Sequence, residues 1–183
     1  MIRIQRIDAQ HQADINIPNE PFELFGKIEV SYADGQWSHR LVRYAPEQIS
    51  RMCFPDETYR YDENPNRVFL GAYDGEACIG LAVLEPGMFR YMYLYDLKVN
   101  ERYRGQHVGE RLMEEARAIA AEQGYCGIYT QGQDNNPAAC LFYLHTGFYI
   151  GGLDTNVYRH TSQEGKADIL FYCECNREGR VDP

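Results

Sequence analysis

The chain has 183 residues, 44% hydrophobic and 25% charged, which suits one soluble domain and excludes a disordered segment. Its formal net charge of −9, from 18 basic and 27 acidic residues without a basic cluster, makes nucleic acid an unsuitable partner. No apolar run reaches the length of a membrane span and the N-terminus lacks a secretory signal, so we expect a cytoplasmic protein without a membrane partner. The negative charge would either attract cationic small molecules or only aid solubility.

The first half of the chain predicts two β-hairpins. Residues 3–7 form a short strand, and the polar stretch that follows is broken by prolines up to residue 21. Residues 22–32 and 37–44 are rich in aromatic and β-branched side chains around an Ala-Asp-Gly-Gln turn, which indicates a hairpin. After a loop at 59–65, a second hairpin pairs residues 68–73 with 78–84 around Asp-Gly.

The strand predicted at residues 91–99 is central to the functional argument. Simple alternation along it places side chains on two faces. One face carries Tyr91, Tyr93, Tyr95, Leu97 and Val99, and the other carries Met92, Leu94, Asp96 and Lys98.

The second half alternates helices and strands. Residues 108–123 have apolar positions at helical spacing and end at Gly124. A strand at 127–131 and a helix at 137–144 with Asn136 as its cap follow, and strands at 149–153 and 169–175 close the chain. The order predicts an α/β (α+β) fold.

Six cysteines occur without any Cys-x-x-Cys pair, which favours buried, reduced thiols over a zinc site, so we expect no metal. Cys173 and Cys175 alternate along the last strand and are the weak exception.

A Gly-containing loop joins the strand at 91–99 to the helix at 108–123. Arg104, Gly105 and Gly109 lie where successive backbone N–H groups would point outward at the positive end of a helix dipole. The spacing matches neither the nucleoside-triphosphate loop nor the dinucleotide fingerprint. The loop is therefore either a pyrophosphate clamp of another kind or an ordinary helix cap.

A second motif lies on the helix at 137–144. Asn136, Ala139 and Tyr143 share one helix face, where the small Ala would let a chain-like ligand pass and the Tyr hydroxyl would act as a proton donor. Taken alone, a tyrosine such as Tyr143 is more often a residue of the core.

Together the two motifs resemble the GNAT superfamily of N-acetyltransferases. The resemblance implies a GNAT fold with a mixed, mostly antiparallel central sheet flanked by helices, and two splayed parallel strands that receive the pantetheine arm of acetyl-CoA. It implies a single domain over residues 1–183, with a variable N-terminal part at 1–66 that contains the hairpin and a catalytic core at 67–175. It also raises a homodimer as one option.

The resemblance assigns roles to particular residues. Tyr143 would protonate the leaving thiolate. Asp96 is the first candidate for the base, Asp154 the second and Glu85 the third. Each carboxylate could instead have a purely structural role. The residues that would bind acetyl-CoA are Leu97, Val99, Arg104, Gly105, Gln106, His107, Val108, Gly109, Asn136, Ala139 and Tyr143.

Within the superfamily the chain is most similar to the streptothricin acetyltransferase group, which acetylates an amine on the lysine-like arm of those antibiotics. The N-terminal hairpin, residues 125–136 and the Gly-Gly-Leu-Asp-Thr-Asn-Val-Tyr tail carry this likeness. Tyr95 and Gln131 stand where the group tends to have acids, and His107 replaces a Gly of the superfamily loop. His107 would either face solvent or donate toward phosphate.

The residues are compatible with three functions. The first is acetylation of a streptothricin-type antibiotic. The second is acetylation of a polyamine, an amino acid, an aminoglycoside or a protein N-terminus, and the third is a non-catalytic CoA-binding module. Many of the 15 tyrosines, such as Tyr158, would either frame a cationic amine or pack on a sheet face.

Overall fold

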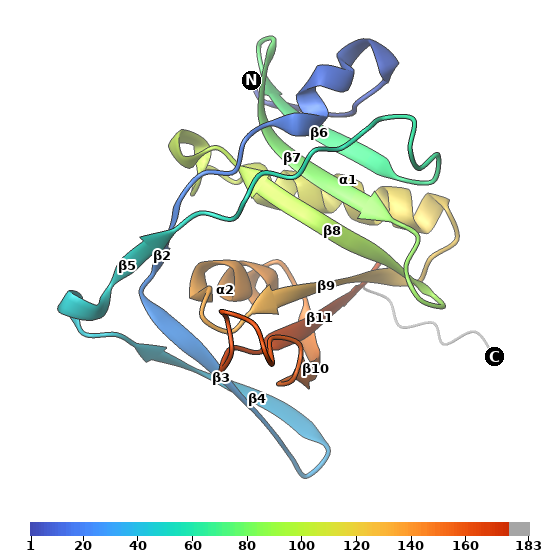
Figure 1. Ribbon diagram of the computed structural model, residues 1–183. Coiled ribbons are helices and arrows are strands. Elements are labelled where there is room, and N and C mark those ends of the chain that lie inside the picture. Colours follow the sequence, from blue (N-terminus) through green and yellow to red (C-terminus); the bar gives the residue numbers. More distant parts are fainter. Residues whose placement is uncertain (176–183) are drawn as a thin grey trace. The chain divides into compact units, whose positions relative to one another are not determined.

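The computed structural model describes residues 1–175, and these form two compact units that each combine separate stretches of chain (Figure 1). The first unit comprises Met1–Glu20, Phe54–Ile128 and the chain from Glu174, and the second comprises Pro21–Cys53 and Tyr129–Cys173. The predicted single domain, with a boundary at residues 66–67, stays a prediction. Its last part, residues 176–183, lies outside the described residues.

An antiparallel four-stranded arrangement organises the first unit. The strands β1 (Arg3–Arg6), β6 (Val68–Asp74), β7 (Ala77–Glu85) and β8 (Tyr91–Val99) each pair antiparallel with the next. The predicted strands and the hairpin between β6 and β7 are therefore confirmed. Gly75, with φ of +60°, supplies the left-handed turn conformation that this hairpin requires.

One face of this arrangement is covered by α1 (Val108–Glu122) (Figure 1). The helix forms because its apolar residues recur at helical spacing, and all six predicted positions are buried. Gly124 ends it in the left-handed region with φ of +81°, as expected. The buried positions are Val108, Leu112, Met113, Ala116, Ile119 and Ala120.

The opposite face carries the 3-10 helix η1 (Ala9–Asn16), where sequence reasoning expected little structure. The Asp8 side chain caps this helix by accepting the N–H groups of Gln10 and His11. Ile15 at its end packs into a cluster with Ile7, Tyr59, Phe69, Leu81 and Val83. The weak hydrophobic periodicity of this segment explains why the helix escaped prediction.

A β-bulge at Tyr95 corrects the predicted alternation of β8. Val83 pairs with Asp96 while the next residue of β7, Leu84, pairs with Leu94, so Tyr95 is the extra residue. Since Val83 and Leu84 point to opposite faces, Leu94 and Asp96 do so too. Asp96 and Lys98 therefore do not share a face with Met92 and Leu94, contrary to the prediction.

The second unit contains α2 (Pro137–His145) and strands β9 (Gly127–Gln133), β10 (Tyr149–Asp154) and β11 (Asp168–Glu174), with β9 beginning in the first unit. These strands are ordered β9-β11-β10, and β10 and β11 are antiparallel. Because β11 runs from Asp168 to Glu174, the strand predicted at 169–175 was displaced by one residue and Cys175 lies beyond the strand.

The N-terminal hairpin also belongs to the second unit and consists of β3 (Gly26–Ala33) and β4 (Gln36–Arg43) (Figure 1). Asp34 and Gly35, with φ of 50° and 78°, form its turn. The prediction of one strand from residue 22 is wrong, because Phe22–Leu24 forms a separate strand, β2, paired with β5 (Ser50–Met52). Two short 3-10 helices remain: η2 (Pro46–Gln48) in this unit and η3 (Glu101–Tyr103) in the first.

All six cysteines are free. Cys140 and Cys173 are buried as expected, but Cys53 and Cys126 are exposed, so the prediction of buried thiols is wrong for those two. Among residues 1–175, no group of three or more His, Cys, Asp or Glu side chains could hold a metal ion. No helix in this range is long and apolar enough to cross a membrane.

Candidate functional site

The loop before α1 presents unpaired backbone donors. Gly105 has φ of 72° and His107 lies in the left-handed region at φ 61° and ψ 14°, immediately before the helix. In the described chain, the backbone N–H groups of residues 105–109 donate to no protein acceptor. A Cβ at Gly105 would meet no atom within 4 Å, so the space beside the loop is open. Such a loop at a helix N-terminus fits a group with several anionic oxygens.

Arg104 fastens this loop to the protein. Its Nε donates to the carbonyl oxygen of Val99 at 2.9 Å, and its guanidinium lies 3.9 Å from a carboxylate oxygen of Glu20. Its backbone N–H donates to the carbonyl oxygen of Glu101. The backbone N–H of Arg104 is therefore already engaged within the protein, and the role of Arg104 toward a pyrophosphate stays a prediction.

His107 has a partner that the sequence did not suggest. Its Nδ1 lies 2.7 Å from Oε2 of Glu110, and its side chain is 75% exposed. Glu110 stands in the first turn of α1, where a carboxylate complements the helix dipole. The contact places the imidazole beside the Glu110 carboxylate at the N-terminal end of α1.

The carboxylate of Asp96 is held by two donors on the face opposite α1. Its Oδ2 accepts from the Tyr59 hydroxyl at 2.9 Å and lies 3.1 Å from Lys98 Nζ. Burial and the Asp96 charge raise the pKa of Tyr59, so this hydroxyl stays protonated as the donor. Tyr59 was missed because it lies in an irregular segment far from β8 in sequence.

The tyrosines around Asp96 already surround a protein cation. The Arg67 guanidinium lies over the rings of Tyr59 at 5.4 Å and Tyr95 at 5.8 Å, and it pairs with Glu85 at 2.5 Å. The Tyr95 hydroxyl donates to Glu57 at 3.2 Å. Glu85, the third base candidate, is therefore an ion-pair partner, and Arg67 lies over Tyr95, one of the tyrosines that would either frame an amine or pack on a sheet face.

In the second unit, the candidate site residues of α2 have structural contacts of their own. Asn136 Oδ1 accepts the N–H of Ala139 at 3.3 Å, so the predicted cap is confirmed. Tyr143 is 8% exposed, and its ring centroid lies 5.3 Å from those of Phe148 and Phe171. The ring is thus anchored in an aromatic core, which fixes the direction of its hydroxyl.

Asp154, the second base candidate, lies at the end of β10 and is exposed. Its Oδ1 accepts the backbone N–H groups of Asn156 at 2.8 Å and Val157 at 3.0 Å. This is the turn-capping role that its residue type favours.

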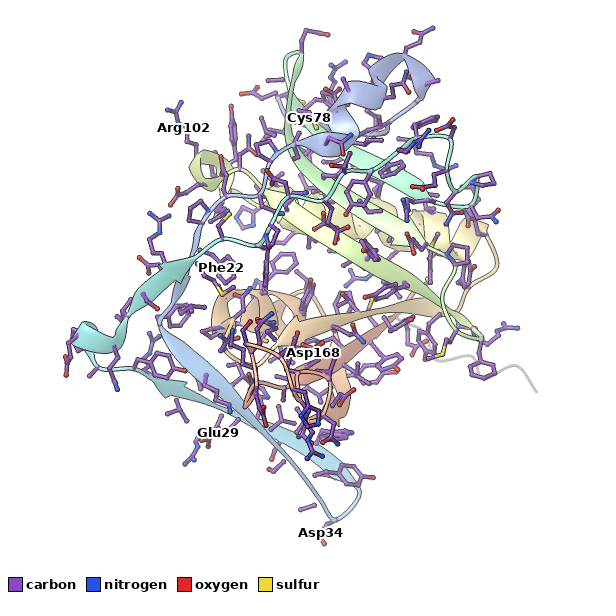
Figure 2. The ribbon with its side chains drawn as sticks, in the orientation of Figure 1. Phe22, Glu29, Asp34, Cys78, Arg102 and Asp168 are labelled. Carbon is purple, nitrogen blue, oxygen red and sulfur yellow. The ribbon has the colours of Figure 1, made fainter. Side chains whose placement is uncertain are left out.

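A polar cluster in the interior of the second unit was not predicted. Asp168, which Figure 2 labels, is 7% exposed. It accepts a hydrogen bond from the Tyr158 hydroxyl at 2.7 Å. Asp134 pairs with Lys27 at 3.0 Å, and the Gln133 amide donates to Gln163. Burial raises the pKa of Tyr158 to about 12. The run of polar residues at 133–136, directly before α2, was the sequence signal for this cluster.

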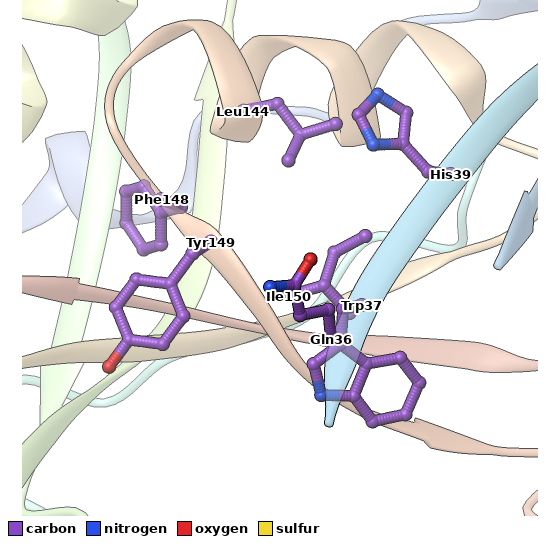
Figure 3. Close-up of a pocket in the computed structure, with 7 residues that line it drawn as sticks. All are labelled: Gln36, Trp37, His39, Leu144, Phe148, Tyr149 and Ile150. Carbon is purple, nitrogen blue, oxygen red and sulfur yellow. The ribbon is translucent and has the colours of Figure 1, made fainter. Parts of the chain in front are cut away.

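A cavity of about 440 Å³ opens elsewhere in the second unit, between the β3–β4 hairpin and the segment from α2 to β10 (Figure 3). None of the predicted site residues lines it. Its wall is mostly apolar and aromatic, with one imidazole and one amide, and these lining residues include no carboxylate that could serve as a base. The lining residues are Gln36, Trp37, His39, Leu144, Phe148, Tyr149 and Ile150.

The predicted site residues divide between the two units. The first unit brings together Leu97 and Val99 of β8 with the loop of residues 104–109, and it also holds Asp96. The second unit holds Asn136, Ala139, Tyr143 and Asp154.

Comparison with known proteins gives the family. A model of the acetyltransferase (GNAT) family matches residues 35–148. Streptothricin acetyltransferase A of Bacillus subtilis is 28% identical over 92% of this chain and 98% of its own length. The streptothricin acetyltransferase of Escherichia coli is 25% identical over 61% of this chain and 64% of its own.

Two solved structures share the fold. An acetyltransferase of Bacillus anthracis, assigned to the streptothricin group and solved with acetyl coenzyme A, has a TM-score of 0.83 and 25% identity, covering 95% of this chain and 98% of that one. A nourseothricin acetyltransferase has a TM-score of 0.78 and 24% identity, covering 96% and 99%. The predicted mixed, mostly antiparallel α/β fold of the GNAT type is confirmed.

Proposed function

The chain belongs to the acetyltransferase (GNAT) family, and on that premise we propose that it transfers an acetyl group from acetyl-CoA to a primary amine of a small cationic molecule of the streptothricin type. The reaction forms a C–N bond at the acetyl carbon and breaks the C–S bond, while the amine loses a proton and the thiolate gains one. The loop before α1 carries the cofactor part of this proposal, and the end-to-end likeness to a streptothricin acetyltransferase carries the acceptor part.

Acetyl-CoA, when bound, supplies the activated thioester. The free N–H groups of residues 105–109 are suited to hold its pyrophosphate, because they are backbone donors at the positive end of α1. Backbone groups of Leu97 and Val99 would pair with the pantetheine arm. An N–H near Leu97, just after the Tyr95 bulge, would stabilise the charge that develops on the thioester oxygen. Asn136 and Ala139 would line the channel.

Three carboxylates with different surroundings are candidates for the base that accepts the proton of the amine. Asp96 remains the first choice because it follows the bulge in β8, but its Oδ2 already has two donors, so a proton would be delivered to Oδ1. Asp154 caps a turn through its Oδ1 and Glu85 is paired with Arg67. Each of the three carboxylates has one oxygen engaged, so the order Asp96, Asp154, Glu85 stays a proposal.

An amine panel tests the acceptor. The purified chain is incubated with acetyl-CoA and a streptothricin, spermidine, lysine, an aminoglycoside or a peptide with a free N-terminus, and released thiol and product mass are measured. We expect the streptothricin to give the highest kcat/KM by at least about tenfold. A better rate with another amine would replace the acceptor while leaving the acetyltransferase in place. Tight acetyl-CoA binding without thiol release for any amine would favour a non-catalytic module.

The role of Tyr143 as proton donor to the leaving thiolate is tested by Tyr143→Phe. General acid catalysis contributes about 10²- to 10⁴-fold, so kcat should fall by about 10²-fold or more while the KM for acetyl-CoA changes little. Tyr32→Phe, at a tyrosine that is 60% exposed on the hairpin, is the matched control and should keep full turnover. Full turnover of Tyr143→Phe would refute the assignment.

A further inference from the structure

The short helix η3, which precedes the loop before α1, is capped from a distant part of the chain. Asn100, the residue before η3, makes no capping hydrogen bond with its side chain. The carboxylate of Glu20, 81 positions earlier, accepts the backbone N–H of Glu101 instead. A carboxylate at the first N–H of a helical turn supplies the acceptor that the turn lacks and complements its dipole. Glu20 therefore fixes where η3 begins.

Glu20 also contacts the residue at the other end of η3. A terminal nitrogen of the Arg104 guanidinium lies 3.9 Å from Oε2 of Glu20 and donates to the main-chain oxygen of Glu20 at 3.4 Å. The side chains of Glu20 and Arg104 are 33% and 38% exposed, so water screens this ion pair only in part. All these residues belong to the first unit. One side chain thus holds the chain at both Glu101 and Arg104.

These contacts act on the residues just before the unpaired backbone donors. The N–H groups of residues 105–109, which donate to no protein acceptor in the described chain, begin directly after Arg104. Gly105 has φ of 72°, and a Cβ there would meet no atom within 4 Å, so packing supports the loop little at this point. The Tyr103 hydroxyl donates to Asp74 at 3.0 Å. Loss of Glu20 would therefore loosen the loop without releasing it.

We propose that Glu20 is a positioning residue for acetyl-CoA, which holds η3 and Arg104 so that the N–H groups of residues 105–109 are already directed toward the pyrophosphate before it binds. The inference rests on the proposed function, in which this loop binds the cofactor. A loop that is ordered in advance loses less conformational entropy when a ligand binds. Glu20 should therefore strengthen acetyl-CoA binding, although its charge has the same sign as that of the phosphates.

The sign of the effect distinguishes positioning from simple electrostatic repulsion. If the Glu20 carboxylate acted only through its negative charge, every variant that removes the charge would bind acetyl-CoA more tightly. If Glu20 positions the loop, binding weakens when the acceptor for the Glu101 N–H is lost. A glutamine at this position keeps an acceptor oxygen without the charge, so it should preserve most of the affinity.

The test measures acetyl-CoA binding to the full chain by isothermal titration, without an acceptor amine. Glu20→Ala should bind acetyl-CoA about tenfold more weakly than the wild type, and Glu20→Gln within about threefold of it. Glu76→Ala, the same truncation at a glutamate that is 98% exposed in the turn between β6 and β7, should bind like the wild type. Unchanged or tighter binding by Glu20→Ala, or an equal loss in Glu20→Gln, would overturn the positioning role.

Hydrogen exchange of the wild type keeps the proposal testable if Glu20→Ala does not fold. Without acetyl-CoA, the Glu101 amide should exchange at least about tenfold more slowly than in an unstructured peptide, because the Glu20 carboxylate holds it. An unprotected Glu101 amide would overturn the proposal. Absence of acetyl-CoA binding by the wild type would refute the proposed function and this inference with it. Normal binding by both the wild type and Glu20→Ala would refute the inference alone.

Discussion

His107 shows how one residue can depart from a family pattern without losing the backbone feature that matters. It stands in the left-handed region with φ of 61°, where a residue with a Cβ pays about 1–2 kcal/mol and Gly does not. Its N–H nevertheless remains in the row of free donors, and its ring pairs with Glu110. The side chain is therefore held by a local partner, while the backbone N–H is left to the loop.

Substitution at this position separates backbone strain from the side-chain contact. His107→Ala and His107→Gly both lose the Glu110 contact, but only Ala keeps the strained conformation. We expect His107→Gly to be more stable than His107→Ala by about 1 kcal/mol, measured by urea denaturation. Acetyl-CoA affinity of His107→Gly should match the wild type, since the N–H is retained. Equal stability of the two variants would show that the loop is not strained.

At the scale of elements, the N-terminal end of α2 and the register of β8 determine the surroundings of the candidate site residues. The bulge at Tyr95 turns Asp96 and Lys98 toward Tyr59, on the face of the strands opposite α1. The start of α2 depends on the Asn136 side chain, which accepts the N–H of Ala139. Asn136 is thus first a structural cap, and its proposed place in the cofactor channel depends on that cap.

The cap is measurable by substitution. Asn136→Ala removes the side-chain acceptor at the N-cap of α2 and should lower the free energy of unfolding by about 1 kcal/mol. Asn136→Asp keeps an acceptor oxygen at the positive helix end and should retain most of the stability. Urea denaturation of both variants at neutral pH checks this, and a loss in Asn136→Asp as large as in Asn136→Ala would contradict it.

At the scale of the whole molecule, the buried acid Asp168 makes stability depend on pH. Burial and its acidic neighbours raise its pKa above the ordinary 3.8, so the folded state holds this proton more tightly than the unfolded state. As pH rises through the interval between the two values, the unfolded state releases its proton first and the free energy of unfolding falls. The loss is complete above the raised pKa.

Asp168→Asn removes this titration while keeping an oxygen that accepts from Tyr158. The difference in free energy of unfolding, wild type minus variant, should therefore decrease between about pH 4 and the raised pKa and then stay level. Urea denaturation across pH 4–8 measures it, with Asp34→Asn expected to follow the wild type. A difference that is constant or grows with pH would disprove the assigned direction.

Much of this molecule is determined by local sequence. The apolar spacing of residues 108–123 decided α1, the Asp-Gly turns decided both hairpins, and Asn136 followed by Pro137 decided the start of α2. These features follow from propensity, periodicity and capping, which act within a few residues. The acetyltransferase family was equally recognisable, because its two motifs are short and contiguous.

The tertiary structure decided the partners. Tyr59 at Asp96, Arg67 over Tyr95, and Lys27 beside Asp134 come together across 37, 28 and 107 positions, and no local pattern encodes such contacts. The bulge at Tyr95 likewise depends on how β7 pairs with β8. Local sequence determines which helices and strands form, because propensity and capping act between neighbouring residues. Side-chain burial and strand pairing determine the long-range contacts, since their stabilisation arises only once distant segments have packed.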